Sequence, residues 1–189
     1  MLRRTLALAV AFVVADPFTA PATSHPVTLG AAATQGSARE QLYGALAGSW
    51  RGTLEYRDYK DPSRRTTLPT LLEATRADES VTLAMTYDDG PNKTVKESDR
   101  LTLDATGKSL TWSSGSTSQR YTVRSFEAPR PGHALRLVLE GEGSDDDKPA
   151  TIRETLVVGL NRMQILKETR PSGQSEFAFR HRYELTRAQ

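Results

Sequence analysis

The sequence has no cysteine, no apolar run long enough to span a bilayer and no region where charge of one sign is concentrated. The absence of cysteine excludes disulfide bonds and a lipoprotein anchor on a processed cysteine, so the hydrophobic core has to supply the stability. The 25 basic and 23 acidic residues alternate finely along the chain. This argues against a nucleic-acid partner, which would require a concentrated basic face.

Catalytic signatures are also lacking. The sequence contains no Ser/His/Asp order, no glycine-rich phosphate loop and no His cluster with the spacing of a metal site. The acidic run at 144–147 lacks the alternation of a calcium loop and is interpreted as a solvated hairpin tip. We therefore expect no enzymatic activity, no cofactor and no bound metal ion.

The first residues have the pattern of a secretory signal peptide. Arg3 and Arg4 precede a short apolar segment that ends at Ala15, where small residues suit a signal peptidase. An uncleaved membrane anchor is the alternative, but the segment is too short to span a bilayer. Residues 16–36 are rich in Pro, Ala, Thr and Gly without periodicity and are predicted to be a disordered linker. We expect a secreted or periplasmic protein, without membrane insertion after signal removal, whose folded domain covers 37–189.

Within that domain the hydrophobic pattern predicts one short helix followed by strands. The helical spacing covers 38–47 and stops at Gly48. Side chains then alternate with a period of two, so that one face of each end strand is buried. The inward sets are Trp50, Gly52, Leu54 and Tyr56 in the first strand, and Phe177, Phe179, His181, Tyr183 and Leu185 in the last.

Turn residues divide the rest of the domain at regular intervals, and no connection is long enough for a crossover helix. This predicts an all-β fold, an up-and-down antiparallel barrel of about ten strands, whose closure removes exposed strand edges. The expected strands are 49–60, 66–77, 79–88, 93–104, 108–113, 118–126, 134–141, 149–159, 162–169 and 175–186.

The motif of Gly48, Trp50 and Gly52 after a short helix resembles the lipocalin-like (calycin) β-barrels, and more loosely their nitrobindin branch. The resemblance covers roughly 38–187. It implies that Trp50 plugs the closed end of the barrel and that Arg187 packs over it. The sequence departs from the pattern in two ways: it has no second lipocalin motif, and Leu54 replaces a further glycine of nitrobindins.

An even number of strands returns the last strand to the end where the first begins. Arg187 is then opposite Trp50, and His181 is opposite Tyr56, with both of the latter side chains directed into the lumen. A guanidinium over an indole face contributes about 0.5–2 kcal/mol.

The resemblance and the inward pattern together predict a protein that binds a small, largely apolar molecule in the barrel lumen. The expected lining is Tyr56, Met85, Tyr87, Trp112, Phe179, His181 and Tyr183. Three alternatives remain open: a haem or porphyrin protein that uses His181, an interaction module with a filled core, and an enzyme built on Glu97, Asp99 or His181. Glu154 is interpreted either as a further polar lumen group or as a side chain that a bulge turns outward.

Overall fold

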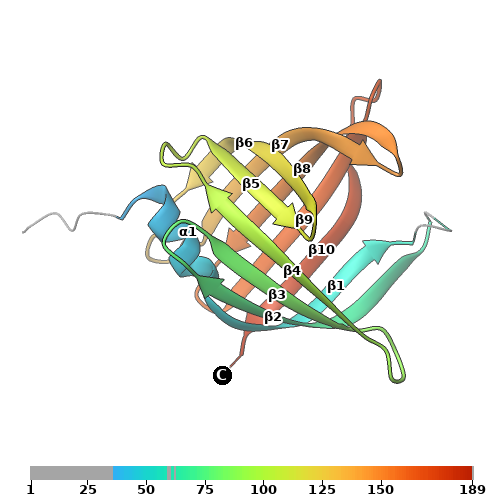
Figure 1. The fold of residues 1–189 in the computed structure, drawn as a ribbon, viewed down its shortest axis with the longest axis horizontal. Coiled ribbons are helices and arrows are strands. Elements are labelled where there is room, and N and C mark those ends of the chain that lie inside the picture. The colour runs from blue at the N-terminus through green and yellow to red at the C-terminus, as the bar shows by residue number, and fades with distance from the viewer. Residues whose placement is uncertain (1–35, 59–60, 62, 189) are drawn as a thin grey trace, which may run out of the picture. The chain divides into compact units, whose positions relative to one another are not determined.

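A computed structural model describes residues 36–58, 61 and 63–188 of the chain. In these residues one helix precedes ten strands, which pair in chain order and close into a barrel because the last strand pairs with the first (Figure 1). Every strand pairing is antiparallel. The predicted up-and-down barrel with one preceding helix is confirmed.

The element bounds lie close to the predicted ranges. They are α1 Ala38–Leu46, β1 Gly48–Arg57, β2 Arg65–Arg76, β3 Val81–Asp88, β4 Thr94–Leu103, β5 Ser109–Ser114, β6 Thr117–Glu127, β7 Leu135–Asp145, β8 Lys148–Val158, β9 Arg162–Pro171 and β10 Ala178–Arg187. Over the described part of the chain, no helix has the length and apolar character needed to cross a bilayer. The predicted signal peptide, 1–15, lies outside the described residues, and so does the predicted linker, 16–36, except for its last residue.

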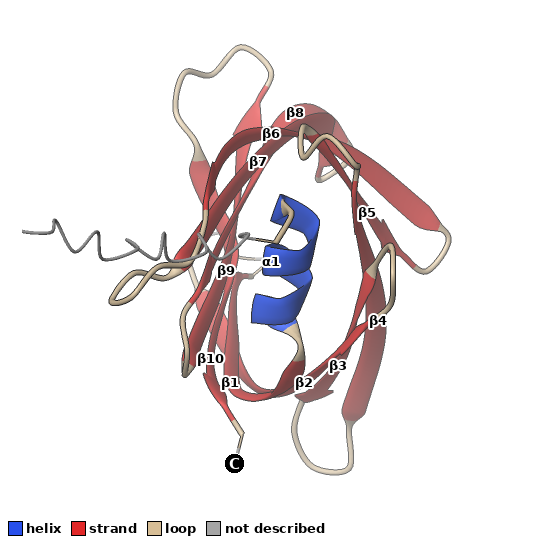
Figure 2. Cartoon of the chain, turned by 90° about the vertical axis from the view of Figure 1, so that its left-hand side faces the viewer, coloured by secondary structure: helices blue, strands red, loops and turns tan. Residues whose placement is uncertain are grey.

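Helix α1 closes one end of the barrel, across which it lies in Figure 2. A reciprocal capping box starts it, because the Ser37 hydroxyl accepts from the Glu40 backbone N–H and the Glu40 carboxylate accepts from that of Ser37. The inner face of the helix buries Leu42, Tyr43 and Leu46 completely. The Tyr43 hydroxyl accepts from the Leu103 N–H at 2.8 Å, which ties α1 to the end of β4.

The pairing of the first and last strands places Arg187 opposite Trp50, as predicted. The guanidinium carbon lies 4.1 Å from the centre of the indole ring. The same guanidinium donates to the carbonyls of Ala47 at 2.9 Å and Ala45 at 3.4 Å. Carbonyl groups at the C-terminal end of a helix have no partner within the helix, so Arg187 supplies one. Since α1 has no basic residue in its last turn, Arg187 supplies the positive charge that a helix C-terminus favours.

Both glycines of the motif are required by this arrangement. Gly48 has a φ of 116°, and a Cβ there would lie 2.6 Å from Nη1 of Arg187. At Gly52 a Cβ would lie 2.0 Å from the Glu184 carbonyl oxygen, because β1 and β10 approach closely. The motif therefore provides the space in which Arg187 reaches the helix and the two end strands pair.

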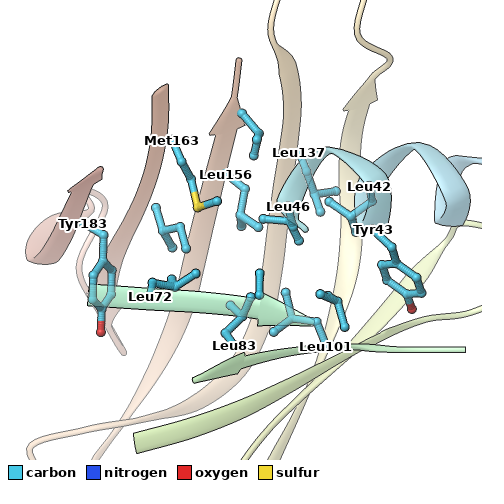
Figure 3. Close-up of a cluster of buried hydrophobic side chains, with 14 of the residues drawn as sticks. Leu42, Tyr43, Leu46, Leu72, Leu83, Leu101, Leu137, Leu156, Met163 and Tyr183 are labelled. Carbon is cyan, nitrogen blue, oxygen red and sulfur yellow. The ribbon is translucent and has the colours of Figure 1, made fainter. Parts of the chain in front are cut away.

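Side chains fill the half of the barrel nearest α1. Figure 3 shows leucines from α1 and from several strands packed together across the lumen. Burial of each such side chain contributes about 1.5–3 kcal/mol. The fully buried leucines of the strands are Leu72, Leu83, Leu101, Leu103, Leu110, Leu135, Leu137, Leu139 and Leu156. Because this half is filled, space for a ligand inside the lumen lies toward the other end.

The largest difference from the predicted ranges is in β7, which was predicted to end at 141 but continues to Asp145, while β8 begins at Lys148. Gly141 and Gly143 lie within the paired part of β7. Both are strand residues whose missing side chains leave room for Gln119. A Cβ would lie 2.9 Å from Gln119 Nε2 at Gly141 and 3.1 Å from Gln119 Oε1 at Gly143.

We expect Arg187→Ala to lower the free energy of unfolding by about 2–3 kcal/mol, because it removes the indole contact and the charged hydrogen bonds to α1. Urea denaturation followed by circular dichroism measures this. Arg187→Lys should lie between the wild type and the alanine variant, since an ammonium cannot donate to both helix carbonyls from a planar group. Arg51→Ala, at an exposed residue on the outer face of β1, is the control. A loss for Arg187→Ala no larger than the control's would contradict the role of Arg187.

Candidate ligand-binding site

A cavity of about 340 Å³ occupies the half of the barrel away from Trp50 and α1. Its walls come from β3 to β10 and reach the β5–β6 hairpin at Ser114 and Thr117 and the β7–β8 hairpin at Ser144. We infer that its entrance lies between these two hairpins. The lining residues are Leu83, Met85, Glu97, Asp99, Trp112, Ser114, Thr117, Ser118, Gln119, Tyr121, Ser144, Ile152, Glu154, Ile165, Lys167, His181 and Tyr183.

Of the seven side chains predicted to line the lumen, the structure brings four together around this cavity, namely Met85, Trp112, His181 and Tyr183. Tyr87 lies directly behind them. Its buried hydroxyl is 2.7 Å from the Tyr183 hydroxyl and donates to Glu97 Oε2 at 3.1 Å. Burial raises the pKa of both tyrosines well above the ordinary value, so both hydroxyls stay protonated.

Tyr56 and Phe179 do not line the cavity. The strand register pairs Tyr56 with His181, as predicted. However, Tyr56 is partly exposed near the end of β1, and among the described residues no hydrogen bond joins its side chain to that of His181. The prediction that Phe179 points into the lumen was wrong. A β-bulge between Phe179 and His181 reverses the alternation, so that Phe179 lies on the outside under the Arg65 guanidinium, 4.0 Å from its ring centre, and Arg180 is buried instead.

Glu154 and Asp99 give the cavity its acidic character. Glu154 points inward and is 4% exposed, which resolves its predicted alternatives in favour of a lumen group. Its Oε1 lies 3.6 Å from Lys167 Nζ. Burial raises the pKa of Glu154 to about 8, an effect that Lys167 opposes and the charge of Asp99 reinforces. Asp99 Oδ2 accepts from the Trp112 indole N–H at 2.8 Å.

His181 is a neutral imidazole in this site. Burial lowers its pKa to about 3, and the positive charges of Lys167 and Arg180 act in the same direction. The ring packs edge-on against Tyr183, with 5.5 Å between ring centres. A neutral imidazole is the form that binds a haem iron. The cavity volume, near the lower end of the range for ligand pockets, nevertheless favours a ligand smaller than a porphyrin. Within the described ranges, no group of three or more His, Asp or Glu side chains is arranged to hold a metal ion.

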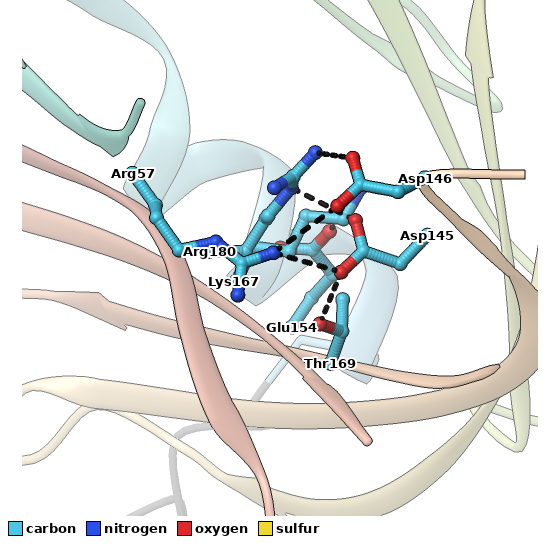
Figure 4. Close-up of polar contacts among 7 residues, drawn as sticks. All are labelled: Arg57, Asp145, Asp146, Glu154, Lys167, Thr169 and Arg180. Atoms are coloured by element: carbon cyan, nitrogen blue, oxygen red, sulfur yellow. Dashed lines mark hydrogen bonds and ion pairs between the residues drawn. The ribbon is translucent and has the colours of Figure 1, made fainter. Parts of the chain in front are cut away.

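An ionic cluster covers one side of the entrance. Asp145 and Asp146, at the tip of the β7–β8 hairpin, reach toward arginines at the ends of β1 and β10 (Figure 4). Arg180 Nε lies 2.9 Å from Asp145 Oδ1, and Arg57 Nη2 lies 3.4 Å from Asp146 Oδ2. The Thr169 hydroxyl donates to Asp145 Oδ2 at 2.7 Å. Two residues of the acidic run predicted to be solvated at 144–147, Asp145 and Asp146, thus hold the hairpin against β10.

Sequence reasoning did not identify Lys167 or Gln119 as lining residues. A signal for Lys167 existed, because it alternates in phase with Met163 and Ile165, both buried. Gln119 had no comparable signal, because the glycines that make room for its side chain lie on another strand.

We expect Glu154→Gln to remove a pH-dependent cost of folding. The pKa of Glu154 is raised in the folded state, so the stability associated with its protonated form is complete below pH 4.5 and is lost as the pH rises toward 8. Between pH 5 and pH 9 the free energy of unfolding of the wild type should therefore fall by on the order of 4 kcal/mol relative to that of the variant. Urea denaturation of both proteins at the two pH values measures the difference.

Glu140→Gln on the outer face is the matched control. Burial raises the pKa of Glu140, but hydrogen bonds from Arg153 and Arg124 outweigh it and hold that pKa below its ordinary value. Glu140 is therefore ionised at both pH values, and the difference between wild type and this variant should stay constant. A constant difference for Glu154→Gln as well would show that Glu154 ionises normally.

No protein-family profile and no curated protein sequence matches this chain. Solved structures do match. The crystal structure of Rv2717c from M. tuberculosis superimposes with a TM-score of 0.60 at 13% identity, covering 80% of this chain and 98% of that one. The S-type phycobiliprotein lyase CPES from Guillardia theta gives a TM-score of 0.54 at 12% identity, covering 79% and 92%. At these identities the similarity shows the fold alone, and at that level it confirms the predicted resemblance.

Proposed function

We propose that the protein binds a small molecule in the barrel lumen, which the molecule enters between the β5–β6 and β7–β8 hairpins. The observation that carries this proposal is the cavity of about 340 Å³ in a barrel whose other half is packed solid. Its volume is within the range of about 300–1,000 Å³ typical of ligand pockets. The similarity to calycin-like barrels supports the same general role.

The lining narrows the kind of ligand. A largely apolar molecule was predicted, and Leu83, Met85, Ile152 and Ile165 provide an apolar surface for it. The same cavity also contains carboxyl, hydroxyl and amide groups, which have to meet water or a polar part of the ligand. We therefore propose a ligand with an apolar body and at least one hydrogen-bonding group.

Binding is favoured over catalysis by the arrangement of the titratable groups. Nucleophilic catalysis requires a nucleophile hydrogen-bonded to a base, and a histidine base is usually held in place by a carboxylate. In the part of the chain that the structure describes, no carboxylate is hydrogen-bonded to the His181 imidazole, and Glu154 approaches Lys167 only to 3.6 Å. One similar structure is a phycobiliprotein lyase, but function follows from the site and not from the fold.

We also propose that the protein acts outside the cytoplasm. This rests on the charged and apolar pattern of residues 1–15. Fusing residues 1–36 to a reporter enzyme that is active only after export tests it, and a reporter retained in the cytoplasm would contradict it.

N-phenyl-1-naphthylamine, a neutral fluorescent probe with an apolar body, tests lumen binding. We expect its emission to increase on binding and its affinity to fall at least about tenfold in Ser114→Trp. Ser114 lines the entrance, and an indole at that position would occupy the path into the cavity. A fluorescence titration of both proteins measures the change.

Ser116→Trp is the matched control, because Ser116 is exposed in the same β5–β6 turn but does not line the cavity. It should bind the probe as the wild type does. Equal losses in the two variants, or no binding by the wild type, would contradict a ligand site in the lumen.

A further inference from the structure

Two carboxylate oxygen atoms in the cavity are buried without a hydrogen-bond partner. They are Asp99 Oδ1 and Glu154 Oε2, and no donor among the described residues reaches either atom. Both residues line the cavity, and Glu154 is almost completely buried. A buried polar atom without a partner carries a cost of about 1–3 kcal/mol, more when it is charged, and a hydrogen-bonding group of a molecule bound in the cavity would relieve this cost.

These carboxyl groups come from different walls of the barrel. Asp99 is on β4 and Glu154 is on β8, with β5, β6 and β7 between them in the closed sheet. They nonetheless line the same cavity of about 340 Å³, to which both residues contribute from opposite sides. Burial raises the pKa of Glu154 and the charge of Asp99 raises it further, which agrees with this placement. A molecule that occupies this cavity therefore lies against both residues.

We propose that the lumen selects an organic cation and holds a protonated amine or amidine between Asp99 and Glu154. This inference rests on the proposed function and names the class of ligand. The N–H donors of such a cation satisfy the two free oxygens, and the apolar body contacts Leu83, Met85 and Ile165.

The charges that face Glu154 favour a cation over an anion. Lys167 on β9 is the one ammonium in the lining, against the carboxyl groups of Glu97 and Asp99 on β4 and of Glu154 itself. His181 is neutral, and Tyr121 and Tyr183 keep their protons. A metal ion is disfavoured because the described acidic side chains do not converge in a group of three.

Binding of a cation also has a consequence for protons. With a pKa of about 8, Glu154 is mostly protonated at pH 7 before binding. An ammonium group beside it stabilises the carboxylate, so the carboxyl proton passes to solvent as the complex forms, while the ammonium keeps its own protons. Formation of the complex at pH 7 should therefore release close to one proton.

Three probes with the same ring system and different charge test the proposal. They are 1-naphthylmethylamine, 1-naphthalenemethanol and the carboxylate of 1-naphthylacetic acid. We expect displacement of N-phenyl-1-naphthylamine by the amine at a concentration at least about tenfold lower than by the alcohol, with the carboxylate weakest. Calorimetric titration of the amine in two buffers of different ionisation enthalpy measures the proton release, which the alcohol should not show.

Asp99→Asn and Glu154→Gln should each lower the ratio of amine to alcohol affinity about tenfold, and Glu154→Gln should abolish proton release. A general loss of folding would lower both affinities without changing their ratio. Glu140→Gln on the outer face, the control, should leave the ratio unchanged.

Equal affinity for the three probes, or preference for the carboxylate, would overturn the selection of cations while leaving lumen binding intact. Failure of all three to displace a bound N-phenyl-1-naphthylamine would also overturn it. If the fluorescent probe itself does not bind, the proposed function fails with it.

Discussion

The contact of Arg187 with Trp50 and with the end of α1 is the interaction on which the rest of the structure depends. One guanidinium covers the indole, pairs with the carbonyls of the helix C-terminus and lies where the last strand meets the first. The Arg187 side chain thus contributes to closing the barrel, to docking the helix and to sealing one end. The glycines at 48 and 52 serve the same contact, because any side chain at either position would displace it.

A barrel sealed in this way has two different halves. Near α1 the interior is aliphatic and solid, as expected where hydrophobic burial alone provides the stability. Away from α1 the inward positions are occupied by Glu97, Asp99, Glu154, Lys167 and His181. Burial disfavours the charged forms of Glu154 and His181. The polar groups in this half therefore lower the free energy of unfolding. Such a cost in a region that could have been filled with leucine is characteristic of a binding site.

The fold could be predicted from the sequence because local patterns determine it. Period-two alternation and turn residues located all ten strands, and the even strand count placed Arg187 opposite Trp50. The site was less predictable, because it depends on departures from alternation and on contacts between distant strands. The bulge between Phe179 and His181 turned Phe179 outward, and β7 continued through Gly141 and Gly143 beyond its predicted end. The environment of Glu154, which depends on Lys167 and Asp99 from other strands, has no signature in its own segment.

The order of the strands also has a consequence for how the protein folds. Nine of the ten pairings join neighbours in the chain and can form as local hairpins, whereas β1 with β10 joins the two ends of the barrel. Until β10 has been synthesised, β1 has an unpaired edge able to pair with another chain. Barrel closure is therefore the natural late step of folding, and the interval before it is when the polypeptide is most exposed to aggregation.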